Sequence, residues 1–154
     1  MIDTPQIVET VTLPMAFLPL KVPASEIRKI MIPGLNEVKA AVAAQGIAEA
    51  GPWFTHHLRK PKDTFDFEIC VPVATPIVTA GRVQAGAWPA MKLVRTVYHG
   101  DYSGLGGGWG EFEAWIAKSG YKTADDLWER YLTGMEAGPD PANWRTELSR
   151  PQIA

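Results

Sequence analysis

Hydrophobic and polar positions along the chain alternate with two different periods, one typical of strands and one of helices. In Thr64–Val73 apolar side chains recur at every second position, as they do on one face of a β-strand. Leu35, Val38 and Val42 recur instead at helical spacing, and that helix is expected to end at Gly46. This mixture of periods predicts an α+β fold.

The predicted elements follow the same order, β-α-β-β, in both halves of the chain. The first helix is expected to be interrupted at Pro33 and Gly34, and the second to cover Leu105–Ser119. Strands are expected at Met15–Val22, Pro52–Leu58, Thr64–Val73, Arg82–Ala87, Met91–His99, Leu127–Leu132 and Trp144–Arg150.

The two halves form an internal repeat, because chemically similar residues recur at a nearly constant offset. Leu35 of the first helix corresponds to Trp109 of the second, 74 residues later. After the longer loop of the second half the offset becomes 79, so that Glu68 corresponds to Glu147. We therefore expect two modules related by a pseudo-twofold axis, which form an antiparallel sheet with the helices on one face and a central ligand cleft.

We expect residues 1–154 to form a single domain. Its first half covers about 14–75, its second half about 82–152, and 76–81 form a linker with turn residues. A chain of 154 residues is long enough to bury a hydrophobic core without disulfides or metals.

Glu68 and Glu147 are the candidate functional residues. Because side chains alternate along a strand, both carboxylates should lie on the sheet face opposite the helices. An ionised carboxylate in apolar surroundings loses hydration worth several kcal/mol, so it takes a cation, strong hydrogen bonds or a proton. Aromatic walls add about 0.5–2 kcal/mol of cation–π attraction per ring, which favours a flat organic cation as the ligand.

Aromatic side chains near the ends of the predicted strands are candidates for the walls of the cleft. We name Trp53, Trp88, Tyr98 and Tyr102, each of which could equally pack in the core. The glycine-rich segment Gly104–Gly110 lacks the pattern of a phosphate-binding loop. It indicates either a close approach between helix and sheet or a flexible lid.

Charge and composition exclude several classes of function. The chain has 15 Lys and Arg against 17 Asp and Glu, a net charge of −2, and no basic run longer than Arg59–Lys62, which argues against direct nucleic acid binding. The single cysteine, Cys70, excludes an internal disulfide, and we expect no metal and no cofactor. Neither a signal peptide nor a membrane-spanning segment is evident, so we expect a cytoplasmic protein.

Four segments, taken in order, resemble the GyrI-like family: Gly46–Pro52, Phe65–Val73, Val97–Leu105 and Trp144–Leu148. That family comprises the effector-binding domains of bacterial multidrug-responsive transcription regulators and their stand-alone relatives. The resemblance implies two fused β-α-β-β modules and a buried glutamate that meets aromatic cations, here Glu147. It also implies a tyrosine near that glutamate, here Tyr131. His57 stands where the first half of the family often carries another tyrosine.

We therefore expect a sensor or sequestering protein for amphipathic aromatic, cationic small molecules. Two alternatives stay open. In one, a hydrolase opens the strained cyclopropane of DNA-alkylating antibiotics, with Glu147 as general acid or base and Tyr131 beside it. In the other, a protein-interaction module inhibits a topoisomerase. Whether the chain forms a homodimer or works with a separate regulatory partner protein is also left open.

Overall fold

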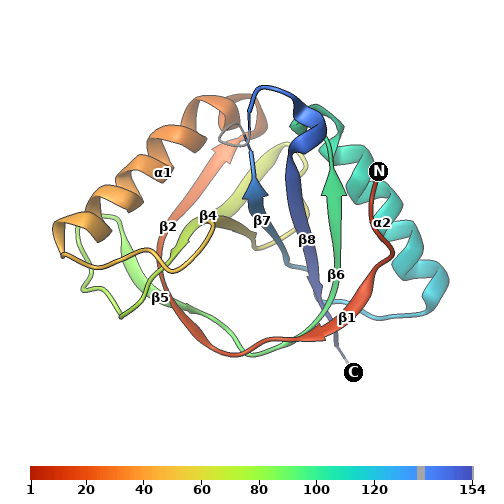
Figure 1. Ribbon diagram of the computed structural model, residues 1–154, viewed down its shortest axis with the longest axis horizontal. Coiled ribbons are helices and arrows are strands. Elements are labelled where there is room, and N and C mark those ends of the chain that lie inside the picture. The colour runs from red at the N-terminus through yellow and green to blue at the C-terminus, as the bar shows by residue number, and fades with distance from the viewer. Residues whose placement is uncertain (135–137, 154) are drawn as a thin grey trace. The chain divides into compact units, whose positions relative to one another are not determined.

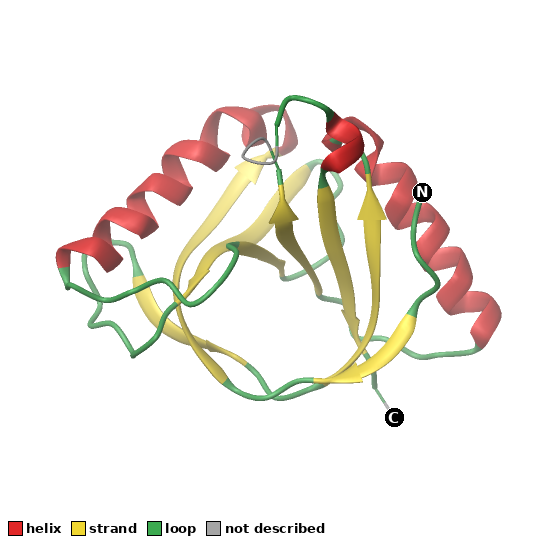
Figure 2. Ribbon diagram, viewed as in Figure 1, coloured by secondary structure: helices red, strands yellow, loops and turns green. Residues whose placement is uncertain are grey.

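The computed structural model describes residues 1–134 and 138–153, and these form an α+β fold of two compact units (Figure 1). Unit 1 contains Met1–Thr10 and Met91–Ala154, and unit 2 contains Val11–Ala90. Each unit contains four antiparallel strands with one α-helix packed against them (Figure 2). The α+β class is therefore confirmed.

Unit 2 has the strand order β3-β4-β2-β5, and its helix packs on β2 and β4. Its elements are β2 (Leu13–Pro23), the 3-10 turn η1 (Ala24–Glu26), α1 (Ile27–Ala44), β3 (Phe54–His57), β4 (Thr64–Pro72) and β5 (Gln84–Trp88). Phe67, Ile69 and Val71 of β4 are buried in one cluster with Leu35 and Val38 of α1, as the two periods predicted. Residues between them on β4 therefore face away from α1.

Helix α1 runs without a break through Pro33, so the predicted interruption at Pro33 and Gly34 is wrong. Proline removes the backbone donor that would bond to the carbonyl of Lys29, but both residues are exposed, so water can satisfy that carbonyl. Gly34 lies on the buried side, where an added Cβ would come within 2.6 Å of Ile69 Cδ1. The glycine allows α1 to approach β4 closely rather than ending the helix.

Unit 1 has the strand order β1-β6-β8-β7, and its helix packs on β6. Its elements are β1 (Gln6–Glu9), β6 (Lys92–His99), the 3-10 turn η2 (Tyr102–Gly104), α2 (Leu105–Ser119), β7 (Leu127–Thr133), the 3-10 turn η4 (Pro141–Asn143) and β8 (Arg145–Pro151). Val94 and Leu148 are buried against Phe112 and Ile116 of α2, so this side of β6 and β8 is the helix-covered face.

Tyr98 also belongs to this core and is not a free aromatic wall. Its hydroxyl donates to the carbonyl of Asp101 at 2.8 Å, and its ring lies against the start of α2. A Cβ added to Gly104 would lie 2.2 Å from Tyr98 Oη, and one added to Gly108 would lie 2.6 Å from Tyr98 Cδ1. The glycine-rich segment therefore serves the close approach between helix and sheet that the sequence offered as one explanation.

Two short strands depart from the predicted order. Strand β1 was not predicted; it precedes β2 in the chain but pairs with β6, with Gln6 opposite Arg95. Strand β5 precedes β6 but pairs with β2, with Gly86 opposite Met15. The strand predicted to begin the second half is thus an edge strand of unit 2, and the β-α-β-β order of unit 1 begins at β6. In the part of the chain that the structure describes, neither α-helix is both long and apolar enough to cross a bilayer.

Candidate functional site

The face of unit 1 opposite α2 carries a cluster of charged side chains at the centre of the sheet. Leu148 faces α2, so its neighbours Glu147 and Ser149 on β8 face the other way. Strand pairing sets Arg130 of β7 opposite Glu147 and Arg95 of β6 opposite Ser149. The predicted orientation of Glu147, away from the helix, is confirmed.

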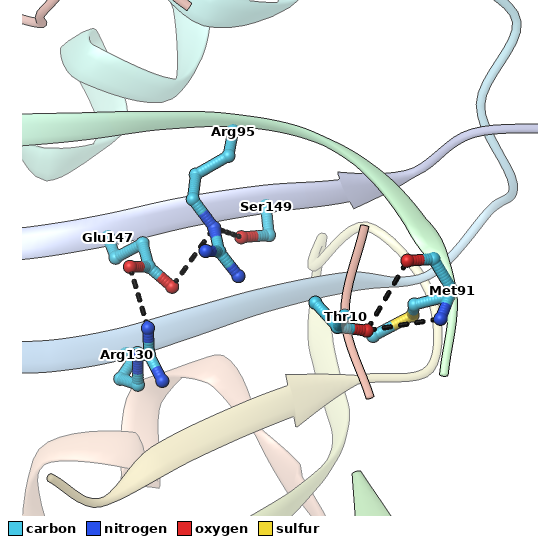
Figure 3. Close-up of polar contacts among 6 residues, drawn as sticks. All are labelled: Thr10, Met91, Arg95, Arg130, Glu147 and Ser149. Atoms are coloured by element: carbon cyan, nitrogen blue, oxygen red, sulfur yellow. Dashed lines mark hydrogen bonds and ion pairs between the residues drawn. The ribbon is translucent and has the colours of Figure 1, made fainter. Parts of the chain in front are cut away.

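Glu147 is held between two arginines (Figure 3). Arg130 Nη2 donates to Glu147 Oε2 at 2.9 Å, and Arg95 Nε lies 3.3 Å from Glu147 Oε1. Arg95 Nε also donates to Ser149 Oγ at 3.3 Å. We call Arg95, Arg130, Glu147 and Ser149 the arginine-glutamate cluster. Glu147 Oε2 is thus hydrogen-bonded, whereas Oε1 lies within ion-pair distance of Arg95 but accepts no hydrogen bond within the described residues.

Burial gives this cluster its electrostatic character. Glu147 is only 6% exposed, and a charge removed from water to this extent requires compensation by its neighbours. Burial lowers the pKa of Arg95, the charge of Glu147 raises it, and the nearby Arg130 lowers it again. Arg95 and Arg130 are therefore brought together around one carboxylate. Glu147 offsets only part of the cost that burial and Arg130 impose on the positive charge of Arg95.

The cluster can bind a planar group through several fixed donors. A guanidinium presents five N–H groups in a rigid fork, and its geometry matches a carboxylate or another planar oxyanion. Within the described residues, the terminal Nη1 and Nη2 of Arg95 donate to no protein group. The arrangement therefore offers hydrogen-bond donors at Arg95 and, within the described residues, one buried acceptor without a hydrogen bond, Glu147 Oε1.

Unit 2 carries the repeat-related carboxylate, Glu68, on its face opposite α1. His56 Nδ1 lies 2.9 Å from Glu68 Oε1, and the two residues are opposite each other on β3 and β4. The rings of Phe54 and Trp88 meet edge to face with centroids 5.1 Å apart. Phe54 is opposite Cys70 on β4, so it lies on the same face as Glu68, and Trp88 contacts it there.

Tyr131 lies on the other face of its sheet, contrary to the expectation that it orients Glu147. It is opposite Thr146 on β8, and its hydroxyl donates to Glu129 Oε1 at 2.8 Å. Glu129 also accepts a hydrogen bond from Trp109 of α2 at 2.6 Å. The strand order Trp128, Glu129, Arg130, Tyr131 places Tyr131 one residue away from the cluster and therefore on the opposite face.

Three further candidates also lie elsewhere than expected. Tyr102 is in η2, where its ring contacts Tyr131 and Trp144, on the same side as α2. His57 alternates with His56 and stacks on Phe67, with centroids 5.4 Å apart, in the core beneath α1. Trp53 packs against that same core. Of the eight candidates, Glu147 lies on the helix-free face of unit 1 and Glu68 and Trp88 on that of unit 2.

Sequence reasoning missed Arg95, Arg130 and Ser149. One signal was present: Arg95 is the one charged residue in the run Leu93–Val97, and such a residue is seldom buried unless it is paired. Its partner could not be identified, because the pairing register of β6, β7 and β8 depends on long loops and on an irregularity between Tyr131 and Thr133. The predicted central cleft stays a prediction.

Cys70 is a buried thiol on the same face as Glu68. Burial raises its pKa well above the ordinary value, and the charge of Glu68 raises it further. Since only the thiolate reacts with disulfide reagents, we expect the native protein to react with Ellman's reagent about tenfold or more slowly than the urea-unfolded chain at mildly alkaline pH. Equal rates would show that this strand opens readily.

In the described part of the chain no three His, Cys, Asp or Glu side chains gather as a metal site.

Comparison with protein families gives one clear match. A model described as a GyrI-like small molecule binding domain matches residues 3–152. No curated protein matches the chain by sequence.

Solved structures with the same fold share little sequence with this chain. The C-terminal domain of EcmrR has 22% identity and a TM-score of 0.84, with 97% of each chain covered. EcmrR in a complex with DNA has 24% identity and a TM-score of 0.82, and the match covers 97% of this chain but 57% of that one. This chain thus spans little more than half of EcmrR.

Two more distant structures are of proteins with a named activity or ligand. A hydrolase from Listeria innocua has 11% identity and a TM-score of 0.66, with 97% of this chain and 91% of that one covered. SAV2435 bound to tetraphenylphosphonium has 10% identity and the same TM-score, with 99% and 95% covered. At such identities these similarities establish the fold alone.

Proposed function

Since this chain belongs to the GyrI-like family of small molecule binding domains, we propose that it binds amphipathic aromatic small molecules on the face of unit 1 opposite α2. The observation that carries the proposal is the arginine-glutamate cluster at the centre of that face. The cluster supplies polar groups at fixed positions, as ligand sites require, and ligand affinity would come mainly from the apolar surface of the aromatic ligand.

A purely structural role explains this cluster less well than binding does. Buried ion pairs seldom stabilise a fold more than apolar side chains of similar volume, because the cost of removing charges from water offsets their attraction. Perturbed charged groups that lie together are more often found at functional sites. The lowered pKa of Arg95, caused first by burial, fits this description.

Ligand charge is the finer part of the proposal. The sequence favoured a cation, and SAV2435 has been solved with tetraphenylphosphonium, an aromatic cation. In this chain Glu147 Oε2 accepts a hydrogen bond from Arg130, and Oε1, 3.3 Å from Arg95 Nε, accepts none within the described residues. The cation hypothesis therefore requires that a ligand donor reach Oε1 beside two guanidinium groups, whereas binding of an aromatic group does not.

Catalysis is the second candidate function, because a Listeria innocua neighbour is named a hydrolase. The proposed general base would be Glu147, whose Oε2 accepts a hydrogen bond from Arg130 and whose Oε1 lies 3.3 Å from Arg95 Nε without accepting one. A base must come within hydrogen-bond reach of the proton that it abstracts, so Oε1 is the oxygen that could act. Hydrolysis therefore stays an alternative to binding. Topoisomerase inhibition, a cytoplasmic location and a homodimer remain predictions from the sequence.

The test is titration with three naphthalene probes that share one aromatic group: naphthylethanol, naphthylacetate and naphthylethylamine. We expect saturable binding of at least one probe by calorimetry, with the probe recovered unchanged. Ser149→Leu, which fills the cluster face, should weaken binding of every probe by about tenfold or more, a loss of about 1.4 kcal/mol. The matched control Ser119→Leu, at the exposed end of α2, should leave binding unchanged.

Two results would contradict this proposal. Failure of all three probes to saturate the protein would remove the aromatic-binding function. Undiminished binding to a folded Ser149→Leu protein would place the site elsewhere. Circular dichroism of both variants distinguishes a blocked site from an unfolded sheet.

A further inference from the structure

We propose that one end of unit 2 docks on the surface of an anionic phospholipid bilayer. Residues 21–29 and 58–66 form this end, and they carry six exposed basic side chains: Lys21, Arg28, Lys29, Arg59, Lys60 and Lys62. We call these six residues the basic end. The inference goes beyond the proposed function and does not depend on it, because no residue of the arginine-glutamate cluster belongs to the basic end.

Strand pairing and one loop contact bring the two segments together. Lys21 of β2 is opposite Asp66 on β4, and Arg59 Nη2 lies 3.2 Å from Asp66 Oδ2. The backbone amide of Ala24, in the turn that leads into α1, donates to the carbonyl of Asp63 at 2.8 Å. The loop between β3 and β4 is therefore held beside the start of α1, and the basic side chains of both segments share one end of unit 2.

The positive charge of the basic end is not balanced by its own carboxylates. Residues 21–29 and 58–66 contain six basic and three acidic side chains, an excess of three positive charges in a chain with a net charge of −2. Lys29 pairs with Glu26 at 3.7 Å, and Arg59 pairs with Asp66. Within the described residues, four basic side chains of this end make no ion pair or hydrogen bond: Lys21, Arg28, Lys60 and Lys62. Such a surface attracts a polyanion.

Two exposed aliphatic side chains accompany these charges. Leu58 is 42% exposed and directly precedes Arg59. Ile32 is 57% exposed and follows Arg28 by four residues on α1, so the two side chains share one face of the helix. Aliphatic side chains beside lysine and arginine are typical of protein surfaces that lie at the boundary between lipid headgroups and acyl chains.

The apolar side chains favour a bilayer over a nucleic acid as the partner. Lysine and arginine attract the phosphates of either one. Single strands are held in addition by bases that stack on exposed aromatic rings. The one aromatic residue of the two segments, Phe65, is half-buried against the core of unit 2. Leu58 and Ile32 can bury apolar surface among acyl chains, whereas the phosphate backbone of a duplex offers them no apolar surface.

The experiment is flotation of the protein with lipid vesicles of two compositions, phosphatidylcholine alone and phosphatidylcholine mixed with phosphatidylserine. The wild-type protein should partition onto the mixed vesicles at least about tenfold more strongly than onto the neutral ones, because each lysine or arginine near an anionic surface adds to the attraction. This preference should decrease as salt concentration rises, since salt screens the interaction between exposed charges.

Variants at exposed positions separate the basic end from the net charge of the protein. Lys60→Gln combined with Lys62→Gln should weaken partitioning onto the mixed vesicles by about tenfold or more. The control Lys118→Gln combined with Lys122→Gln removes two exposed charges near the end of α2 in unit 1, and it should change partitioning by no more than about twofold. Leu58→Ser should weaken partitioning by about threefold or more, because it removes an aliphatic side chain that the bilayer would bury.

Three results would overturn this proposal. Equal partitioning onto both kinds of vesicle, or onto neither, would show that no anionic bilayer is recognised. Equal losses in the two double lysine variants would assign the attraction to net charge rather than to the basic end. Release of the protein from vesicles by a DNA duplex, together with undiminished partitioning of Leu58→Ser, would assign the basic end to nucleic acid instead. Binding of the naphthalene probes is measured without vesicles, so the proposed function stands or fails separately.

Discussion

Replacement of Glu147 by glutamine is expected to lower the free energy of unfolding by roughly 2–3 kcal/mol. The substitution keeps the size of the side chain and removes its charge, so Arg95 and Arg130 lose the carboxylate that lies between them. Glu147 is 6% exposed, and water can screen this repulsion only at the arginines, whose side chains are 22% and 30% exposed. Urea unfolding followed by tryptophan fluorescence measures the change.

The double variant Glu147→Gln with Arg95→Met is the control for this mechanism. It removes one of the two positive charges that repel each other. The free energy of unfolding should therefore rise by about 1 kcal/mol or more above that of the single variant Glu147→Gln. A Glu147→Gln protein as stable as the wild type would mean that the cluster is hydrated rather than buried. No recovery in the double variant would mean that the carboxylate acts through packing.

Replacement of Gly108 by alanine is expected to lower the free energy of unfolding by about 1–2 kcal/mol, even though alanine favours helices. The new Cβ would lie 2.6 Å from Tyr98 Cδ1, so either the ring or α2 must shift. Overpacking of this kind costs roughly 1–3 kcal/mol. The higher helix propensity of alanine offsets roughly 0.5–1 kcal/mol of this loss in the free energy of unfolding.

Gly107→Ala is the matched control, because it lies one residue earlier in α2 and an added Cβ there meets nothing within 4 Å. It should raise the free energy of unfolding by roughly 0.5–1 kcal/mol. In thermal denaturation, the melting temperature is therefore expected to fall for Gly108→Ala and to rise for Gly107→Ala. Two stabilised proteins would show that Tyr98 can move aside.

Much of the fold could be predicted from local patterns. The alternation along β4 identified the side chains that pack beneath α1, and the helical spacing of α2 identified Trp109, Phe112 and Ile116 as its buried side. These predictions succeed because an element that buries one face must repeat its apolar residues at the spacing of that element, every second residue in a strand and every three to four in a helix. The continuous helix through Pro33 could not be predicted, since it depends on that residue being exposed.

The site was harder to predict because it depends on pairing register. The repeat aligned Glu147 with Glu68 and gave its orientation correctly, since alternation within one strand settles which face a side chain takes. Which residues lie beside Glu147 depends on β6 and β7, which are paired through nonlocal contacts. A shift of one residue in register would bring Tyr131 to Glu147 in place of Arg130. The resemblance that suggested Tyr131 carries no information about that register.

The pairing of β1 with β6 has a consequence for synthesis on the ribosome. Unit 2 is one continuous segment, Val11–Ala90, and its strands and helix can assemble as soon as that segment has emerged. The segment that forms β1 precedes unit 2 in the chain, yet its partner β6 emerges only after the whole of unit 2. Strand β1 must therefore stay unpaired with β6 until 80 residues of unit 2 have been made, so unit 1 is completed after unit 2 although it contains the earlier strand.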